Sequence, residues 1–296
     1  MANAREVEQR IKSVKNIAQV TRALQAVSAS KVKKSIQILE RTRPYSTKAW
    51  QVLQRIANQP QSEGLHQLLQ QPATVKNVLV VVISGDRGLA GAYYSNLMRF
   101  LQKEFEGHSA NVRYITVGSK GRDILLRQGK DILAEFSDMP AAPSFVDVSP
   151  IGHLVVEEFL THAVDEVYLV YTDFKNMIIQ TPVIKKLLPL MTDGSERVND
   201  FEDRSISPTE YIYEPGQEEI LDNIIPRFTA LQVFHAIVEA LASEHAARMV
   251  AMKNATDNAA DLASSLQLEY NKARQQTITN ELLDIAGGAE ALEQSL

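Results

Sequence analysis

The feature that most constrains the fold is the last third of the chain. Residues 217–286 contain no glycine and a single proline, Pro226. A stretch this free of helix-breaking residues predicts one continuous helix. At about 1.5 Å rise per residue, the roughly 60 residues after Pro226 would span on the order of 90 Å. No single small domain can bury a rod of that length.

Apolar residues recur along this stretch at seven-residue steps, which predicts a narrow seam for one partner helix. One series contains Ile224, Leu231, Val238, Met252, Ala259, Leu266 and Ala273, and a second contains Phe234, Leu241, Ala255 and Leu262. His245 interrupts the first series, whereas Arg248 and Glu269 interrupt the second. The later part of the seam relies on alanine, so we expect close and thin packing there.

The first 57 residues predict the partner helix. A single stripe contains Val7, Ile11, Val14, Ile17, Leu24 and Val27. Pro44 is the first helix breaker, and we expect it to kink or end the helix, which residues 49–56 can resume. The two helical segments lie at opposite ends of the sequence. Their pairing is therefore long-range, and an antiparallel arrangement is the simplest one.

Charge is distributed unevenly, because the segment up to Ala57 has twelve basic and three acidic residues while the whole chain has a net charge of −5. A basic helix is typical of nucleic-acid binding, of a solvated face or of an acidic protein partner. No aromatic residue precedes Tyr45 to stack on bases, so we expect no nucleic-acid partner. The short cluster Lys31, Lys33 and Lys34 remains compatible with phosphate.

Composition excludes several classes of site. The chain has no cysteine, which rules out disulfides and thiolate metal ligands. The six histidines are scattered without metal-ligand spacing, and no constellation supports catalysis, so we expect no catalytic, cofactor or metal site. We find no apolar run near 18 residues and no signal peptide, so we expect a chain that does not itself span a membrane.

The middle of the chain alternates strand-like and helical patterns, which predicts a small α/β layer domain. Expected strands are 78–83, 112–117, 132–136, 166–172, 177–184 and a short edge at 211–213; expected helices run to about 105 and over 122–128 and 151–163. The first turn contains Gly85, Gly88 and Gly91. Their spacing differs from the dinucleotide pattern G-x-G-x-x-G. We therefore expect tight turns and helix packing there instead of nucleotide binding.

Six short stretches, in three parts of the chain, resemble the gamma subunit family of F-type ATP synthases. The sequence ITNELLDIAGGA begins at Ile278, ASEHAARMVAMKNATDN begins at Ala242, with YNKARQ at Tyr270, and DRGLAG begins at Asp86. The stretches RIKSV at Arg10 and VSASK at Val27 are similar to the first helix of the family. The likeness covers nearly the whole chain and is loosest over residues 107–164.

The resemblance implies a long antiparallel coiled coil of N- and C-terminal helices with an inserted Rossmann-like α/β domain. Its parts would be a helix at 1–57, a linker at 58–76, an α/β foot at 77–215, a helix at 216–288 and a tail at 289–296. In function it implies a non-catalytic rotor shaft that couples proton flow to ATP synthesis or hydrolysis and helps regulate the ATPase. The implied partners are the alpha and beta subunits, the epsilon subunit and the ring of membrane c subunits, with one copy per complex at the cytoplasmic face of a bacterial membrane.

The same resemblance implies contact residues. Rotor-to-stator contacts would be Leu24, Lys31, Arg248, Arg274, Gln275, Thr279 and Glu281, and foot contacts would be Tyr211 and Glu214. Leu24 stands where some members have methionine, a change that conserves volume. The cysteine-bearing insertion of chloroplast members is missing. Two alternatives from other classes remain open at this point: a nucleotide-dependent α/β enzyme with a coiled-coil arm, and a freestanding coiled-coil scaffold.

Overall fold

The computed structural model describes residues 4–57, 67–72, 74–190 and 217–293. These residues form two units. The compact α/β unit comprises residues 28–248, and the coiled-coil unit comprises residues 1–27 and 249–296. The edge strand expected at 211–213 lies outside the described residues, as does most of the linker expected at 58–76.

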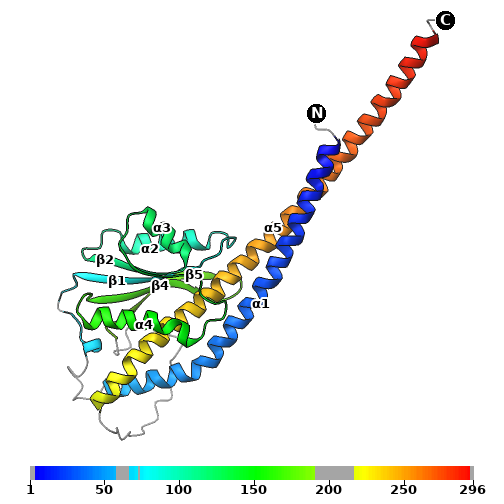
Figure 1. Cartoon of the computed structure of the whole chain (residues 1–296). Coiled ribbons are helices and arrows are strands. Elements are labelled where there is room, and N and C mark those ends of the chain that lie inside the picture. Colours follow the sequence, from blue (N-terminus) through cyan, green and yellow to red (C-terminus); the bar gives the residue numbers. More distant parts are fainter. Residues whose placement is uncertain (1–3, 58–66, 73, 191–216, 294–296) are drawn as a thin grey trace. The chain divides into compact units, whose positions relative to one another are not determined.

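The coiled-coil unit is built from parts of two helices, α1 (Ala4–Ala57) and α5 (Gln217–Glu293). The two run antiparallel within this unit (Figure 1). Side chains that are buried or half-buried follow one another at alternating steps of four and three residues. In α1 these are Val7, Ile11, Val14, Ala18 and Thr21, and in α5 they are Met252, Thr256, Ala259, Ala263, Leu266, Tyr270 and Ala273.

Within this unit, one of the two predicted apolar series is therefore correct. The series through Met252, Ala259, Leu266 and Ala273 faces inward, but the second series is wrong by one residue. Leu262 is 51 % exposed and Ile17 is 54 % exposed, while alanine, threonine and tyrosine occupy the inner positions. A pattern based only on hydrophobicity chose the larger apolar side chains, whereas close approach of the two helices favours small ones.

A polar pair lies inside this seam. The hydroxyl oxygens of Thr21 and Thr256 are 2.7 Å apart. The Thr21 hydroxyl also lies 3.0 Å from the carbonyl oxygen of Ile17, and that of Thr256 lies 2.8 Å from the carbonyl oxygen of Met252. Each hydroxyl has one hydrogen, so one threonine donates to its partner and the other donates to its own helix. The pair is thus fully hydrogen-bonded although it is buried.

The compact α/β unit contains one five-stranded sheet in the order β3-β2-β1-β4-β5. Its strands are β1 (Asn77–Ile83), β2 (Asn111–Val117), β3 (Ile132–Phe136), β4 (Glu166–Phe174) and β5 (Gln180–Leu188). The first four are parallel, and β5 pairs with β4 in the antiparallel sense. The connecting helices are α2 (Tyr93–Phe105), α3 (Ser119–Arg127) and α4 (Phe145–Leu160), and a short 3₁₀ turn, η1 (Gln67–Leu69), precedes β1.

Alternating residues of β1 face the two sides of the sheet, and each side is covered. Val78, Val80 and Val82 pack with α2 and α3, while Leu79, Val81 and Ile83 belong to a larger core with α4, α5 and part of α1. A strand buried on both faces is an unbroken apolar run, which is why the sequence predicted β1 correctly.

The α/β prediction is confirmed, with three local corrections. The last strand begins at Gln180 instead of Met177. Helix α4 begins six residues earlier than expected, because the backbone N–H of Ser144 donates to the Asp147 carboxylate at 2.7 Å and caps the helix despite Pro150. Of the two outcomes expected at Pro44, a kink or an end, the end is wrong, because helix α1 continues through Pro44.

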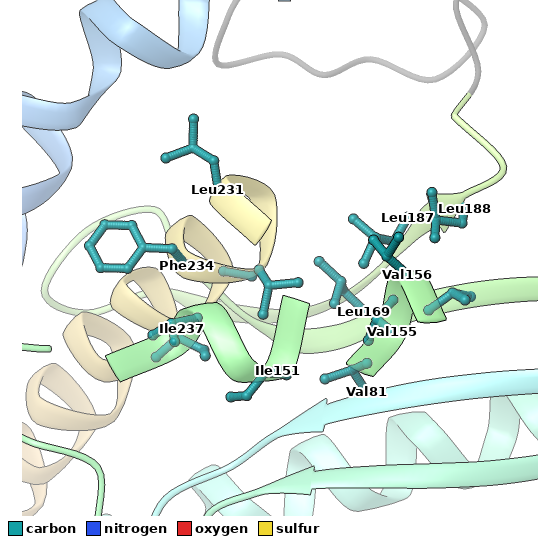
Figure 2. Close-up of a cluster of buried hydrophobic side chains, with 14 of the residues drawn as sticks. Val81, Ile151, Val155, Val156, Leu169, Leu187, Leu188, Leu231, Phe234 and Ile237 are labelled. Carbon is teal, nitrogen blue, oxygen red and sulfur yellow. The ribbon is translucent and has the colours of Figure 1, made fainter. Parts of the chain in front are cut away.

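Within this unit α5 contacts α1, where Trp50 stacks on Phe228, and it also packs against further elements. Side chains on all sides of residues 228–238 are buried. Figure 2 shows Leu231, Phe234 and Ile237 of α5 in the same apolar cluster as Ile151 and Val155 of α4. A Cβ added to Gly152 would lie 2.5 Å from that of Ala230, so α4 and α5 approach closely there.

This burial also bears on the membrane expectation. Contrary to the sequence analysis, α5 contains an 18-residue window long and apolar enough to cross a membrane, but 72 % of that window is buried inside the fold. Its apolar character is that of a core helix.

Candidate functional site

The site lies at the carboxyl ends of β1 and β2, where open α/β sheets usually bind their ligands. Here a side chain of α5 occupies that crevice. A Cβ added to Gly85, just after β1, would lie 2.3 Å from Glu244 Oε2. A side chain at position 85 would therefore displace the Glu244 carboxylate, which rests directly on the Gly85 backbone. The turn and packing role predicted for this glycine is confirmed.

Arg248 ties α5 to the same loop. Its Nε donates to the carbonyl oxygen of Gly88 at 3.0 Å, and its Nη2 donates to that of Arg87 at 2.9 Å. The guanidinium also forms a close ion pair with Glu244, one turn earlier on α5. Glu244 is 4 % exposed and Arg248 is 7 % exposed. We call the arrangement of Glu244, Arg248 and the loop 85–88 the Arg248 clamp.

Two tyrosines of α2 complete the clamp. The Tyr94 hydroxyl donates to the carbonyl oxygen of Arg87 at 2.5 Å and lies 3.0 Å from Glu244 Oε1. The Tyr93 hydroxyl donates to the carbonyl oxygen of Ala240 on α5 at 3.1 Å. Burial, and then the neighbouring Glu244 charge, raise the pKa of both phenols. Both tyrosines are therefore neutral hydrogen-bond donors.

Opposing influences act on the Glu244 carboxyl. Burial raises its pKa above the usual range, although the Arg248 guanidinium and the Tyr94 hydroxyl oppose that shift. A buried carboxylate without partners would cost several kcal/mol, on the order of the penalty for an isolated buried charge. The buried Glu244 carboxylate therefore depends on its ion pair with Arg248 to offset that cost.

His245 lies beside the clamp and has a defined tautomer. Arg248 Nη1 lies 3.0 Å from His245 Nδ1, and a guanidinium can only donate, so Nδ1 accepts and Nε2 carries the proton. Burial, followed by the charges of Arg248 and Lys31, lowers the pKa of His245 to about 3. The ring is neutral at pH 7. Its Nε2 is buried and has no hydrogen-bond partner among the described residues.

The backbone amides that might hold a phosphate at the start of α3 are already used. Ser119 N donates to Asp86 Oδ1 at 2.8 Å, and Gly121 N donates to the Ser84 hydroxyl at 2.9 Å. Lys120 N donates to the carbonyl oxygen of Gly85 at 3.0 Å. These contacts leave no cradle for a nucleotide phosphate at this helix start. The chain's own groups occupy this part of the crevice.

The contact residues predicted from the sequence lie in different parts of the chain's structure. Lys31 and Arg248 belong to the compact α/β unit, where Arg248 is buried in the clamp. Leu24 is half-buried in the coiled-coil unit, where four further residues are exposed: Arg274, Gln275, Thr279 and Glu281. Tyr211 and Glu214 lie outside the described residues. Their roles as rotor-to-stator or foot contacts stay predictions.

Sequence reasoning missed Glu244, His245, Arg87 and Tyr94. It treated His245 and Arg248 as interruptions of an apolar seam. A usable signal was present, because an acidic and a basic residue four positions apart lie on one helix face. Their occurrence inside an otherwise apolar stretch indicates a buried pair with further partners.

Comparison with known proteins agrees with this architecture. A family model described as ATP synthase matches residues 3–292. The ATP synthase gamma chain of Dehalococcoides mccartyi strain CBDB1 is 42 % identical over 293 residues, which cover 99 % of this chain and 100 % of the relative. The chain belongs to the ATP synthase gamma chain family. The gamma chain of Roseiflexus castenholzii is also similar, with 40 % identity over 301 residues, 99 % of this chain and 100 % of the relative.

Solved structures share the fold of this gamma chain family member. A chain from the central stalk and c-ring of the Tetrahymena thermophila mitochondrial ATP synthase is 27 % identical with a TM-score of 0.62, covering 80 % of this chain and 99 % of that one. A chain from the Euglena gracilis mitochondrial ATP synthase, in rotational state 3, has a TM-score of 0.66 at 23 % identity, covering 98 % and 94 %. The second likeness concerns the fold alone.

Proposed function

We propose that this gamma chain is the central rotor shaft of an F-type ATP synthase. It couples proton flow through a membrane ring to ATP synthesis and hydrolysis at an alpha/beta hexamer. The observation that carries the proposal is the Arg248 clamp. The α/β unit uses its ligand crevice to hold α5 of its own chain, and the same α5 also forms the coiled-coil unit.

A shaft of this kind performs no chemistry of its own. The filled crevice and the occupied amides at the start of α3 support a non-catalytic role. ATP would be made and hydrolysed on the alpha and beta subunits, whose affinity changes follow the rotation of the shaft. The chain would also help to regulate ATPase activity through its contact with the epsilon subunit.

The end of α5 supports a partner around the shaft. Ile278, Leu282, Leu283 and Ile285 are all exposed, Ile285 by 70 %. A run of large apolar side chains on an exposed helix is typical of a protein interface. We assign this interface to the alpha/beta hexamer. The foot would contact the epsilon subunit and the c-ring through Tyr211 and Glu214, and one copy of the chain would lie at the cytoplasmic face of the membrane.

The predicted contact residues would not all act in the same way. Arg274, Gln275, Thr279 and Glu281 are exposed on α5 and would form a catch for a beta-subunit loop in one rotational state. Leu24 and Lys31 would contribute weaker contacts from α1. Arg248 would act differently, because its guanidinium is already bonded to Glu244 and to two carbonyl oxygens of its own chain. Its contribution to coupling would be to hold α5 on the loop 85–88.

Purification of the tagged chain from cells that express it with alpha and beta subunits tests the proposal. We expect a complex with one copy of the chain that hydrolyses ATP, and no hydrolysis by the chain alone. ATP turnover by the isolated chain would favour an α/β enzyme. A stable monomer or dimer that ignores both subunits would favour a coiled-coil scaffold.

A further inference from the structure

A groove between α1, α4 and α5 of the compact α/β unit contains no residue of the Arg248 clamp and is independent of the proposed rotary role. Its volume is about 680 Å³, within the roughly 300–1,000 Å³ of sites for small organic molecules. The groove is lined by residues of three helices, among them Arg41 and Tyr45 of α1, Phe145 and Ser149 of α4, and Arg227 and Phe234 of α5. A molecule of one or two rings therefore fits it.

The floor of the groove is apolar. Ala230, Leu231 and Phe234 of α5 line it and are buried, and the last two belong to the apolar cluster in Figure 2. The ring of Phe145, which is 39 % exposed, makes an edge contact with that of Phe234, with centroids 6.2 Å apart. Tyr45 also lines the groove and is 61 % exposed. These aromatic side chains offer contact to a flat apolar body.

The charged side chains that line the groove are arginines without partners. Arg41 and Arg227 are exposed, and within the part of the chain that the structure describes neither side chain forms a hydrogen bond or an ion pair. The described lining residues include no aspartate or glutamate. A guanidinium presents parallel N–H donors that match the two oxygens of a carboxylate. The charge of the groove is therefore complementary to an organic anion.

We propose that this groove binds a small organic anion in which a carboxylate is attached to an aromatic body. The carboxylate would accept hydrogen bonds from the Arg41 and Arg227 guanidinium groups, and the rings would lie on the apolar floor against Phe145 and Phe234. The bound molecule would contact α1, α4 and α5 together. It should therefore stabilise the packing of these three helices and raise the melting temperature of the chain.

Equilibrium dialysis of the full-length chain with three naphthalene compounds of different charge tests the proposal. The compounds are 2-naphthoate, the neutral 2-naphthamide and the cationic 2-naphthylmethylammonium. We expect saturable binding of one naphthoate per chain. The amide should bind about tenfold more weakly, because it loses the charge-assisted hydrogen bonds, and the ammonium more weakly still. Equal affinities for the three compounds would overturn the proposal, since apolar contact alone would then account for binding.

Arginine variants test which side chains hold the carboxylate. Arg227→Met and Arg41→Met should each weaken naphthoate binding about tenfold and leave amide binding nearly unchanged. Arg99→Met is the matched control, because it removes the same charge from an exposed position of α2 that does not line the groove. All three side chains are exposed, so we expect the variants to fold, and thermal unfolding checks this. The same naphthoate affinity in all three variants would contradict the proposal.

A crystal structure of the chain with bound 2-naphthoate provides a readout that does not depend on any variant. We expect the rings against Phe145 and Phe234 and the carboxylate within hydrogen-bond distance of Arg41 or Arg227. Binding that never saturates, or naphthoate bound only elsewhere on the chain, would overturn the proposal. None of these outcomes bears on rotation, so a failure here leaves the proposed function standing.

Discussion

The Glu244 carboxylate and the Arg248 guanidinium form an ion pair one turn apart on α5, inside the crevice where an α/β sheet would otherwise bind a ligand. Burying such a pair costs desolvation, so it is weak grounds for stability by itself. Instead, the geometry of the ion pair determines where α5 lies on the loop after β1. The guanidinium donates to the carbonyl oxygens of both Arg87 and Gly88, which ties this point of α5 to the loop after β1.

Loss of the Arg248 guanidinium should therefore destabilise the fold strongly. We expect Arg248→Met to lower the free energy of unfolding by about 3–5 kcal/mol, because Glu244 would be left as an unpaired buried charge. Arg274→Met is the matched control on the exposed part of α5, with an expected change within about 0.5 kcal/mol. Urea unfolding of the full chain measures both.

The double variant Arg248→Met with Glu244→Gln tests the reason for that loss. If the unpaired charge is responsible, its removal should restore part of the stability. Equal unfolding energies for Arg248→Met and Arg274→Met would contradict a clamp.

The close approach at Gly85 gives a second test with an internal control. A methyl group there would lie 2.3 Å from Glu244 Oε2, so Gly85→Ala should force α5 away from the loop and cost about 1–3 kcal/mol. Gly88→Ala meets nothing within 4 Å and should be nearly neutral. Thermal unfolding compares the two, and similar melting temperatures would argue against a tight contact.

His245 predicts a pH dependence. Its pKa is lowered from 6.5 to about 3 in the folded chain, so between these values the unfolded chain binds a proton that the folded chain does not. Stability should fall as the pH drops below 6.5, and the loss should level off below about 3. At pH 5 this amounts to about 2 kcal/mol relative to pH 8.

The variant His245→Gln isolates this contribution. Its unfolding energy should fall less than that of the wild type between pH 8 and pH 5, by about the same 2 kcal/mol. His153→Gln changes an exposed histidine and should leave the wild-type pH dependence intact. Parallel curves for wild type and His245→Gln would show that His245 is not buried in the neutral form.

A catch on α5 predicts a difference between two exposed glutamines. Gln275→Leu should reduce coupled ATP hydrolysis and complex yield about two- to tenfold, the effect of one lost hydrogen bond. Gln267, whose side-chain amide nitrogen donates to Asn271 Oδ1 of the same helix at 3.5 Å, provides the control Gln267→Leu. Small and equal effects in the assembled complex would remove the grounds for a catch.

The sequence predicted most of the architecture because its signals are local. The breaker-free run after Pro226 and the apolar run Val78–Ile83 each specify an element without reference to the rest of the chain. The seam register was predicted less well. Thr256 and Ala263 occupy inner positions while Leu262 is exposed, since the distance between two helices decides which side chains fit.

The sequence contains a signal for the Glu244–Arg248 pair but not for the loop that the Arg248 clamp holds. The clamp joins residues about 160 positions apart, Arg87 and Arg248, and much of the contact is made by backbone carbonyl oxygens that carry no sequence signature. The roles of the exposed residues Arg274 and Gln275 could not be derived for a different reason. Their role depends on a partner, so the chain's own packing does not specify it.

Observation of rotation is the decisive test of the rotor shaft. The chain has no cysteine, so Lys103→Cys, at an exposed position of α2, offers a single attachment point for a gold particle. With the alpha/beta hexamer fixed to a surface and ATP supplied, a rotor shaft predicts that the particle turns in one direction with three dwells per turn. A particle that stays fixed, or that diffuses without direction while the complex hydrolyses ATP, would contradict it.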